Sequence, residues 1–295
     1  MPSLLGEKHY EAKFDTSVRG DLLPGTNIEV VREPAGRGEY KHALFDFDGT
    51  VSLIREGWQD VMGRMMVDIL SQIPSNATDE ELKAQSQGFI LRTTGMQTIY
   101  QMIGLGEEVE RLGGVAREPE DYKKRYIGLL SEHIKANLDA LRRGATDPEE
   151  MLVPGARELL EELRERGVKL CLASGTDAEN VKEEAELLGV ASCFEDRIYG
   201  AIDDHRAFSK AIVIDRILLD NDIEGRNLLG FGDGYVEIDN TKSVGGTAVG
   251  VATDESAMTG AVDPLKRERL LGVGADIVVP DFRHCKALAT YLMER

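Results

Sequence analysis

The feature that most constrains the fold is the alternation of strand-like and helix-like segments in the second half of the chain. Short apolar runs there predict buried strands, at 168–173, 197–202, 227–232, 247–252 and 276–279. The amphipathic stretches between them predict helices, at 155–166, 178–188 and 209–219. This alternation is typical of a parallel sheet with helices on both faces. A further strand is expected earlier in the chain, at 42–47 (HALFDF).

The segment after that early strand has a different hydrophobic pattern. Its apolar residues recur at spacings of three and four, which predicts helices and no strands. The predicted helices lie at 57–73, 78–92 and 119–141, with a short one after Gly95. Thr78 and Glu81 form a capping-box pattern at one helix start. We therefore expect an α/β core with an inserted all-helical domain.

The expected domain boundaries lie where these hydrophobic patterns change. They give an N-terminal extension at 1–40, a core at 41–54 and 152–295, and a helical insert at 55–151. In the extension, only 27–32 (NIEVVR) resembles a strand. The first 15 residues lack a basic start followed by an apolar run, so no secretory signal is expected.

Charge and composition exclude some classes of protein. The net charge of −18 argues against nucleic acid as a partner, because phosphate backbones select basic surfaces. No segment approaches the roughly 20 apolar residues of a membrane-spanning helix, and we expect a cytoplasmic protein. The three cysteines form no zinc or disulfide pattern. The basic pairs Arg142-Arg143 and Lys266-Arg267 are expected on solvated helix faces.

Polar residues stand where the predicted strands end. Asp46 and Asp48 close the first strand, Ser174-Gly175-Thr176 follows the second, and Asp233 follows the fourth. Lys210 begins the helix after the third strand. Because ligands of open parallel sheets bind beyond the carboxyl ends of the strands, we expect these residues to converge.

The residue types in this set indicate phosphoryl transfer. Two carboxylates as close as Asp46 and Asp48 repel unless a cation relieves them, and Mg²⁺ suits oxygen ligands beside phosphate. One carboxylate can attack phosphorus, and the other can move a proton. Asp233 and Glu237 fit as further metal ligands.

The phosphoryl group itself needs hydrogen-bond donors and a positive charge. The Ser174 hydroxyl and nearby amides, including that of Gly175, can hold its oxygens. Lys210 offers a fixed cation.

Four motifs in order resemble the haloacid dehalogenase superfamily: ALFDFDGT at 43–50, LASGT at 172–176, the Lys210 helix, and GFGDGYVE at 230–237. The helical insert resembles the C1-type cap of the phosphoglycolate phosphatase and β-phosphoglucomutase group, which implies a Rossmann-like core. The lysine motif departs from the family, since Ser209-Lys210-Ala211 replaces a common Lys-Pro. Lys182 and Lys242 are therefore kept as lesser candidates.

The resemblance also implies roles for individual residues. Asp46 would be the nucleophile and Asp48 the acid and base, while Ser174 and Lys210 would hold the phosphoryl group. Magnesium would be bound by the Asp46 carboxylate, the Asp48 backbone carbonyl, Asp233 and, directly or through water, Glu237.

The expected function is a magnesium-dependent phosphatase for a small phosphate monoester, with a sugar phosphate favoured by family analogy alone. The segment from Arg92 to Gly95 resembles a cap specificity loop, and Arg55 and Trp58 are expected at the entrance of the site. Two alternatives remain. A phosphomutase of the β-phosphoglucomutase type would use the same residues, and a binding module would have lost the activity.

Overall fold

The alternating segments form one sheet in the computed structural model, which describes residues 10–202, 204 and 207–294. Within these residues the strand order is β1-β2-β8-β7-β6-β3-β4-β5. The strands are β1 (Asp21–Leu22), β2 (Glu29–Val30), β3 (His42–Phe45), β4 (Lys169–Asp177), β5 (Ile198–Ala201), β6 (Leu228–Gly232), β7 (Thr247–Val251) and β8 (Ile277–Val279). The strands from β8 to β5 pair in parallel, whereas β1 and β2 add an antiparallel edge. The expected α/β class with a mostly parallel sheet is confirmed.

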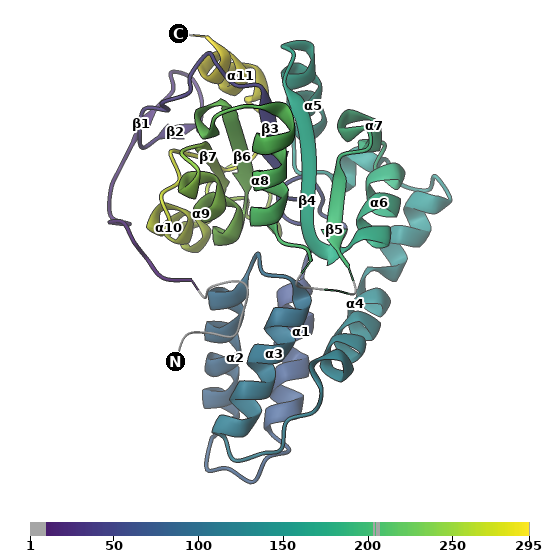
Figure 1. Cartoon of the computed structure of the whole chain (residues 1–295). Helices are drawn as coiled ribbons and strands as arrows, with labels where there is room; N and C mark the ends of the chain where they lie inside the picture. Colours follow the sequence, from purple (N-terminus) through teal and green to yellow (C-terminus); the bar gives the residue numbers. More distant parts are fainter. Residues whose placement is uncertain (1–9, 203, 205–206, 295) are drawn as a thin grey trace.

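The helices fall into an inserted group and a group packed on the sheet. The inserted helices are α1 (Trp58–Leu70), α2 (Asp79–Thr93), α3 (Thr98–Arg111) and α4 (Pro119–Arg142). The others are α5 (Ala156–Glu165), α6 (Ala178–Leu187), α7 (Ala191–Phe194), α8 (Lys210–Asn221), α9 (Tyr235–Ser243), α10 (Pro264–Gly272) and α11 (Cys285–Met293), with short 3₁₀ turns at Pro148–Met151 and Gly225–Asn227. The arrowheads of β4 and β5 point toward the inserted group (Figure 1).

Local signals explain where these helices begin and what they bury. The capping box at α2 forms as expected, with the Thr78 hydroxyl accepting from the Glu81 amide. On α1 the buried face consists of Val61, Met62, Met65, Met66 and Leu70. The methionines of α1 therefore serve as packing residues. The segment after Gly95, expected to be a short helix, is the 14-residue α3.

The central strands are tied together by aromatic packing. Phe45 of β3 and Phe231 of β6 stack with ring centroids 4.3 Å apart and an interplanar angle of 1°. Both rings are fully buried. This contact fixes the two strand ends that carry Asp46 and Asp233.

The N-terminal extension is an edge of the sheet. β2 pairs with β8 in antiparallel register, and Glu29 receives two hydrogen bonds from Arg267 of α10 at 2.7 Å each. The expectation that the chain has no secretory signal concerns residues 1–15. Of these, residues 1–9 lie outside the described residues.

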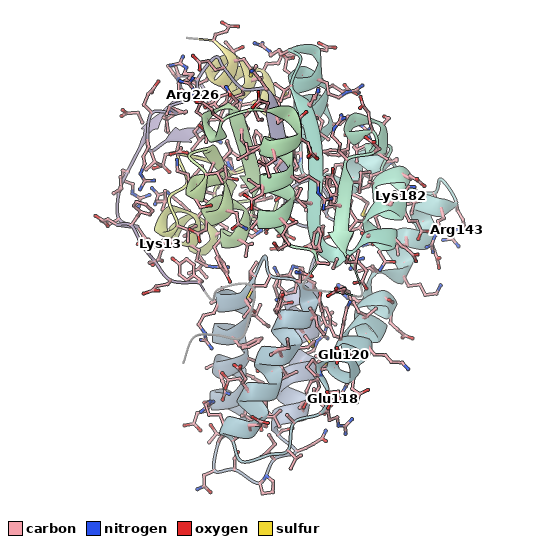
Figure 2. The ribbon with its side chains drawn as sticks, in the orientation of Figure 1. Lys13, Glu118, Glu120, Arg143, Lys182 and Arg226 are labelled. Atoms are coloured by element: carbon pink, nitrogen blue, oxygen red, sulfur yellow. The ribbon has the colours of Figure 1, made fainter. Side chains whose placement is uncertain are left out.

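One expectation about basic residues was wrong. Lys266 and Arg267 do not lie on a solvated face, because their side chains are 15% and 7% exposed and pair with carboxylates. Arg142 and Arg143 are exposed as expected, and Arg143 lies at the outer edge of the molecule (Figure 2).

None of the helices in the described part of the chain is both long and apolar enough to cross a membrane.

The helices α1 to α4 all fall between β3 and β4. The domain boundaries at residues 41, 55 and 152 remain predictions.

The buried histidine of β3 predicts a pH-dependent stability. Burial lowers the pKa of His42 from 6.5 to about 4, and the charge of Lys169 acts in the same direction. The unfolded chain takes up this proton below pH 6.5, before the folded chain does. Stability should therefore be complete above pH 6.5 and fall as the pH drops toward 4.

Urea unfolding of the wild type and of His42→Leu at a series of pH values would test this. The wild type should lose more unfolding free energy between pH 6.5 and 4 than the variant does. Equal losses in both proteins would show that His42 contributes nothing.

Candidate active site

The site is built on the adjacent ends of β3 and β6. The two strands are in parallel register with Phe45 opposite Phe231, and the Asp46 amide donates to the Phe231 carbonyl at 2.9 Å. The Asp233 amide donates to the Thr50 hydroxyl at 3.0 Å. These contacts bring Asp46 and Asp233 from distant parts of the sequence to one cavity.

Gly49 makes this convergence possible. Its φ is +76°, a backbone conformation that residues with side chains rarely adopt. A Cβ at this position would lie 2.5 Å from the Asp233 Oδ2 atom. The turn after Asp48 therefore needs glycine both for its backbone shape and for the close approach of Asp233.

Lys210 supplies the positive charge beside Asp46. The Ser209 hydroxyl caps α8 by accepting from the Ile212 amide, which places Lys210 in the first turn. Its Nζ lies 2.7 Å from the Asp46 Oδ1 and also contacts Glu237. Burial raises the pKa of the Asp46 carboxyl above its usual range, Lys210 partly opposes this, and the nearby charge of Asp233 adds to it.

The two lesser lysine candidates lie elsewhere. Lys182 is exposed on α6, toward the outer edge of the molecule (Figure 2). Lys242 pairs with Asp276 at 2.8 Å. Neither lines the cavity that contains Asp46, so the geometry favours Lys210.

Asp48 is oriented by hydroxyl groups from β4. Its Oδ2 accepts from Thr176 at 2.9 Å and from Ser174 at 3.4 Å. Its Oδ1 is buried and has no hydrogen-bond donor among the described residues. A loop was expected from Ser174 onward, but β4 continues to Asp177 with an irregular register after Ala173. Ser174 and Thr176 are two residues apart in β4, so both hydroxyls lie on the same side of the strand and reach Asp48.

The inserted helices close the cavity from the opposite side. A Cβ on Gly175 would lie 3.0 Å from the Met96 carbonyl oxygen, and one on Gly234 would lie 3.0 Å from the Gly95 Cα. The Gln97 side chain donates to the Phe208 carbonyl at 2.8 Å. The loop between α2 and α3 therefore rests directly on the core.

The cavity measures about 70 Å³. It is lined by Asp46, Asp48, Arg55, Trp58, Thr94, Gly95, Met96, Thr98, Gln101, Tyr126, Leu130, Ser174, Gly175, Thr176, Lys210 and Asp233. Of the predicted site residues, Glu237 contacts the cavity through Lys210.

Arg55 and Arg92, the two arginines suggested by the sequence, lie in different surroundings. Arg55 lines the cavity, and its guanidinium is bonded to Glu184 of α6. Arg92 does not belong to the lining. Its side chain is 47% exposed, and its Nη2 lies 3.8 Å from Glu108.

The oxygen atoms of the site fit a hard divalent cation. The Asp46 and Asp233 carboxylates face one cavity, and Glu237 Oε2 is buried with no hydrogen-bond partner in the described chain. Oxygen donors of this kind are those that Mg²⁺ prefers. Within residues 10–202, 204 and 207–294, however, no three His, Cys, Asp or Glu side chains form a ligand cluster. The expected set does not require one when Glu237 binds through water, because Asp46 and Asp233 are then the two side-chain ligands and Asp48 contributes its backbone carbonyl.

A second lysine, which sequence reasoning placed in solvent, lies beside Asp233. Lys266 Nζ is 3.0 Å from Asp233 Oδ2 and also contacts Glu255. Burial disfavours its charged form, but these two carboxylates raise the pKa of Lys266 above its usual value. Asp46 and Asp233 are therefore each paired with a lysine of their own.

Sequence reasoning missed several residues of the site. Thr50 lies inside a motif used for the expectation, and its place just after a strand end is the signal that could have identified it, whereas Thr176 was expected at the site but was given no role. Glu184 and Lys266 lie in ordinary amphipathic helices, so no local pattern distinguishes them.

Comparison with protein families gives one match that covers most of the chain. The model for haloacid dehalogenase-like hydrolases matches residues 40–245. A search of curated protein sequences returned no match.

Solved structures share the fold at low sequence identity. A conserved haloacid dehalogenase-like protein of unknown function from Agrobacterium tumefaciens has a TM-score of 0.55 at 16% identity, covering 86% of this chain and 100% of its own. A predicted phosphoglycolate phosphatase from Haemophilus somnus has a TM-score of 0.54 at 16% identity, covering 85% and 98%. CbbY from Rhodobacter sphaeroides, solved with xylulose-(1,5)bisphosphate, has a TM-score of 0.51 at 16% identity, covering 83% and 95%. These similarities support the fold, including the inserted helices.

The Gly49 contact predicts a stability difference between two alanine variants. Gly49 and Gly25 both have a positive φ, at +76° and +75°, but a Cβ on Gly25 meets no atom within 4 Å. Gly25→Ala should therefore cost about 1 kcal/mol of unfolding free energy from backbone strain alone. Gly49→Ala should cost more, because Asp233 must also move. Equal losses in denaturant unfolding would show that Gly49 does not determine the position of Asp233.

Proposed function

Because the chain belongs to the haloacid dehalogenase-like hydrolases, we propose that it is a magnesium-dependent phosphatase that hydrolyses a small phosphate monoester through an aspartyl-phosphate. The observation that carries this proposal is the buried Asp46 carboxylate. It is bonded to Lys210 and shares one cavity with Asp48, Ser174 and Asp233. A sugar phosphate is the substrate class that we favour by analogy with the β-phosphoglucomutase group.

In the first proposed step Asp46 acts as the nucleophile. A carboxylate oxygen forms a bond to phosphorus as the bond from phosphorus to the ester oxygen breaks. The departing oxygen takes a proton from the Asp48 carboxyl group. The hydroxyl of Thr176 holds Asp48 in place for this transfer through its 2.9 Å hydrogen bond.

In the second proposed step the intermediate is hydrolysed. Asp48, now a carboxylate, accepts a proton from water as the water oxygen bonds to phosphorus. The bond between phosphorus and Asp46 breaks, and inorganic phosphate leaves. Asp48 regains its proton and Asp46 its charge, so both residues return to their starting states.

The phosphoryl oxygens need positive charge and hydrogen-bond donors in both steps. We propose that Lys210, Ser174 and the Gly175 amide provide them, since all three line the cavity. Magnesium would be held by Asp46, the Asp48 carbonyl, Asp233 and, directly or through water, Glu237. When bound, this cation would offset the repulsion between the carboxylates and the phosphoryl oxygens.

The leaving group would contact the inserted helices. Arg55 lies at the cavity wall and is the stronger candidate for this contact. Arg92 is the weaker candidate, because its side chain is exposed beside Glu108 and does not line the cavity. The loop that contains Gly95 rests on the core and would exclude bulk water during the reaction.

A cytoplasmic location and the absence of a nucleic-acid partner remain predictions from the sequence.

Substitution of the two catalytic aspartates should give distinct losses of phosphate release. Asp46→Asn should abolish turnover, because an amide is a poor nucleophile. Asp48→Asn should lower kcat roughly a hundredfold to ten-thousandfold while metal binding survives. Asp239→Asn is a suitable control, since Asp239 lies on the same helix as Glu237 but pairs with Lys13, which lies at the outer edge of the molecule (Figure 2). Near-wild-type activity of Asp46→Asn with magnesium present would rule out the mechanism.

Removal of magnesium should stop the reaction, and readdition should restore it. A panel of phosphate esters assayed for inorganic phosphate, with and without a chelator, would check this. The same reactions analysed for isomerised sugar phosphate distinguish a phosphatase from a phosphomutase. Isomer formation without net phosphate release would favour the phosphomutase.

A further inference from the structure

The part of the cavity that would receive the leaving group is almost free of formal charge. Apart from Arg55, the side chains that reach it from the inserted helices and their loops are neutral: Trp58, Thr94, Met96, Thr98, Gln101, Tyr126 and Leu130. Aromatic, amide and hydroxyl groups of this kind suit an alcohol or polyol, which they can contact by stacking and by hydrogen bonding. Charge selection in this subsite therefore depends on Arg55.

The charge of Arg55 is already balanced by the protein. Its Nη2 and Nε donate to the two Glu184 oxygens at 2.6 and 3.1 Å. Both side chains are buried, at 7% and 4% exposure, so water screens this pair weakly. The Asp48 Oδ1 lies 3.6 Å from the Arg55 Nε on the cavity side. Together the guanidinium and the Glu184 carboxylate carry no net charge, and Asp48, which is protonated in the first proposed step, adds none.

The other cation in the lining is balanced in the same way. Lys210 contacts both Asp46 and Glu237. Arg92, which could have offered an unpaired charge, lies outside the lining beside Glu108. Among the described residues that line the cavity, no cation is left to compensate a second anion. A carboxylate or second phosphate on the leaving group would instead lie near the Glu184 carboxylate with no unbalanced cation beside it, and juxtaposed like charges are unfavourable.

We propose that the enzyme selects phosphate esters whose leaving group carries no negative charge, and that Glu184 determines this specificity by neutralising Arg55. This inference rests on the phosphatase function proposed above. Arg55 then acts as a hydrogen-bond donor to a hydroxyl group rather than as an anion receptor. Specificity of this kind depends on what the site rejects as well as on what it binds.

Matched pairs of esters test the preference directly. We would compare kcat/KM for 2-hydroxyethyl phosphate with that for 2-phosphoglycolate, and glycerol 3-phosphate with 3-phosphoglycerate. Each pair differs in whether the leaving group bears a hydroxyl or a carboxylate. The wild type should favour the neutral member of each pair at least about tenfold.

The Glu184→Gln variant tests the assigned residue. The amide keeps the size of the side chain and can still accept a hydrogen bond from Arg55, but it removes the balancing charge. The preference for the neutral ester should fall about tenfold, because the freed charge of Arg55 can then meet the carboxylate. The control is Glu183→Gln, on the same helix, because Glu183 is exposed and pairs with Arg142 at 2.7 Å. It should leave the preference unchanged.

A double variant, Arg55→Gln with Glu184→Gln, keeps the test decisive if the single change destabilises the fold. It removes both charges together, so no uncompensated buried cation remains. Its preference should return toward that of the wild type.

Two results would overturn the inference. A wild type that favours the carboxylate member of each pair would contradict the substrate class. An unchanged preference in folded Glu184→Gln would contradict the role of Glu184. The absence of turnover with all four esters and with acetyl phosphate would instead overturn the proposed phosphatase function, and this inference with it.

Discussion

The structure depends on how buried negative charge is accommodated at the carboxyl ends of β3 and β6. The parallel register and the stacked rings of Phe45 and Phe231 place Asp46 and Asp233 at neighbouring strand ends. Burial and mutual repulsion raise the pKa of Asp46. Two lysines from different helices, the buried Lys210 and the partly buried Lys266, supply the opposing charges. The same electrostatic arrangement that keeps the site folded prepares it for a divalent cation and a phosphoryl group.

Features with a local cause could be predicted from the sequence. The helix start at Thr78 follows from its capping box with Glu81, and the buried strands follow from short apolar runs. Convergence of Asp46 and Asp233 could also be predicted, because parallel strands all end at one edge of the sheet. The family motifs strengthened this expectation, and the fold class and the family are both confirmed.

Features that depend on distant contacts could not be predicted. Glu184 meets Arg55 across 129 positions, and Lys266 meets Asp233 across 33. In the sequence each is one charged residue of an amphipathic helix, which is normally solvated. The extension of β4 past Ala173 was missed because Ser-Gly-Thr is a common turn composition, whereas here pairing with β5 resumes at Asp177. Such outcomes are decided by tertiary packing rather than by local preference.

The central claim is that Asp46 and Asp233 share one divalent cation, beside which Asp46 reacts with phosphorus. A crystal structure of the enzyme with Mn²⁺ and beryllium fluoride tests it most directly, since manganese gives an anomalous signal and beryllium fluoride mimics a phosphoryl group on a carboxylate. We expect one anomalous peak about 2.1 Å from oxygens of both Asp46 and Asp233, with the fluoride group bonded to Asp46. A metal peak away from these residues, or a fluoride group bonded to a different side chain, would contradict the account.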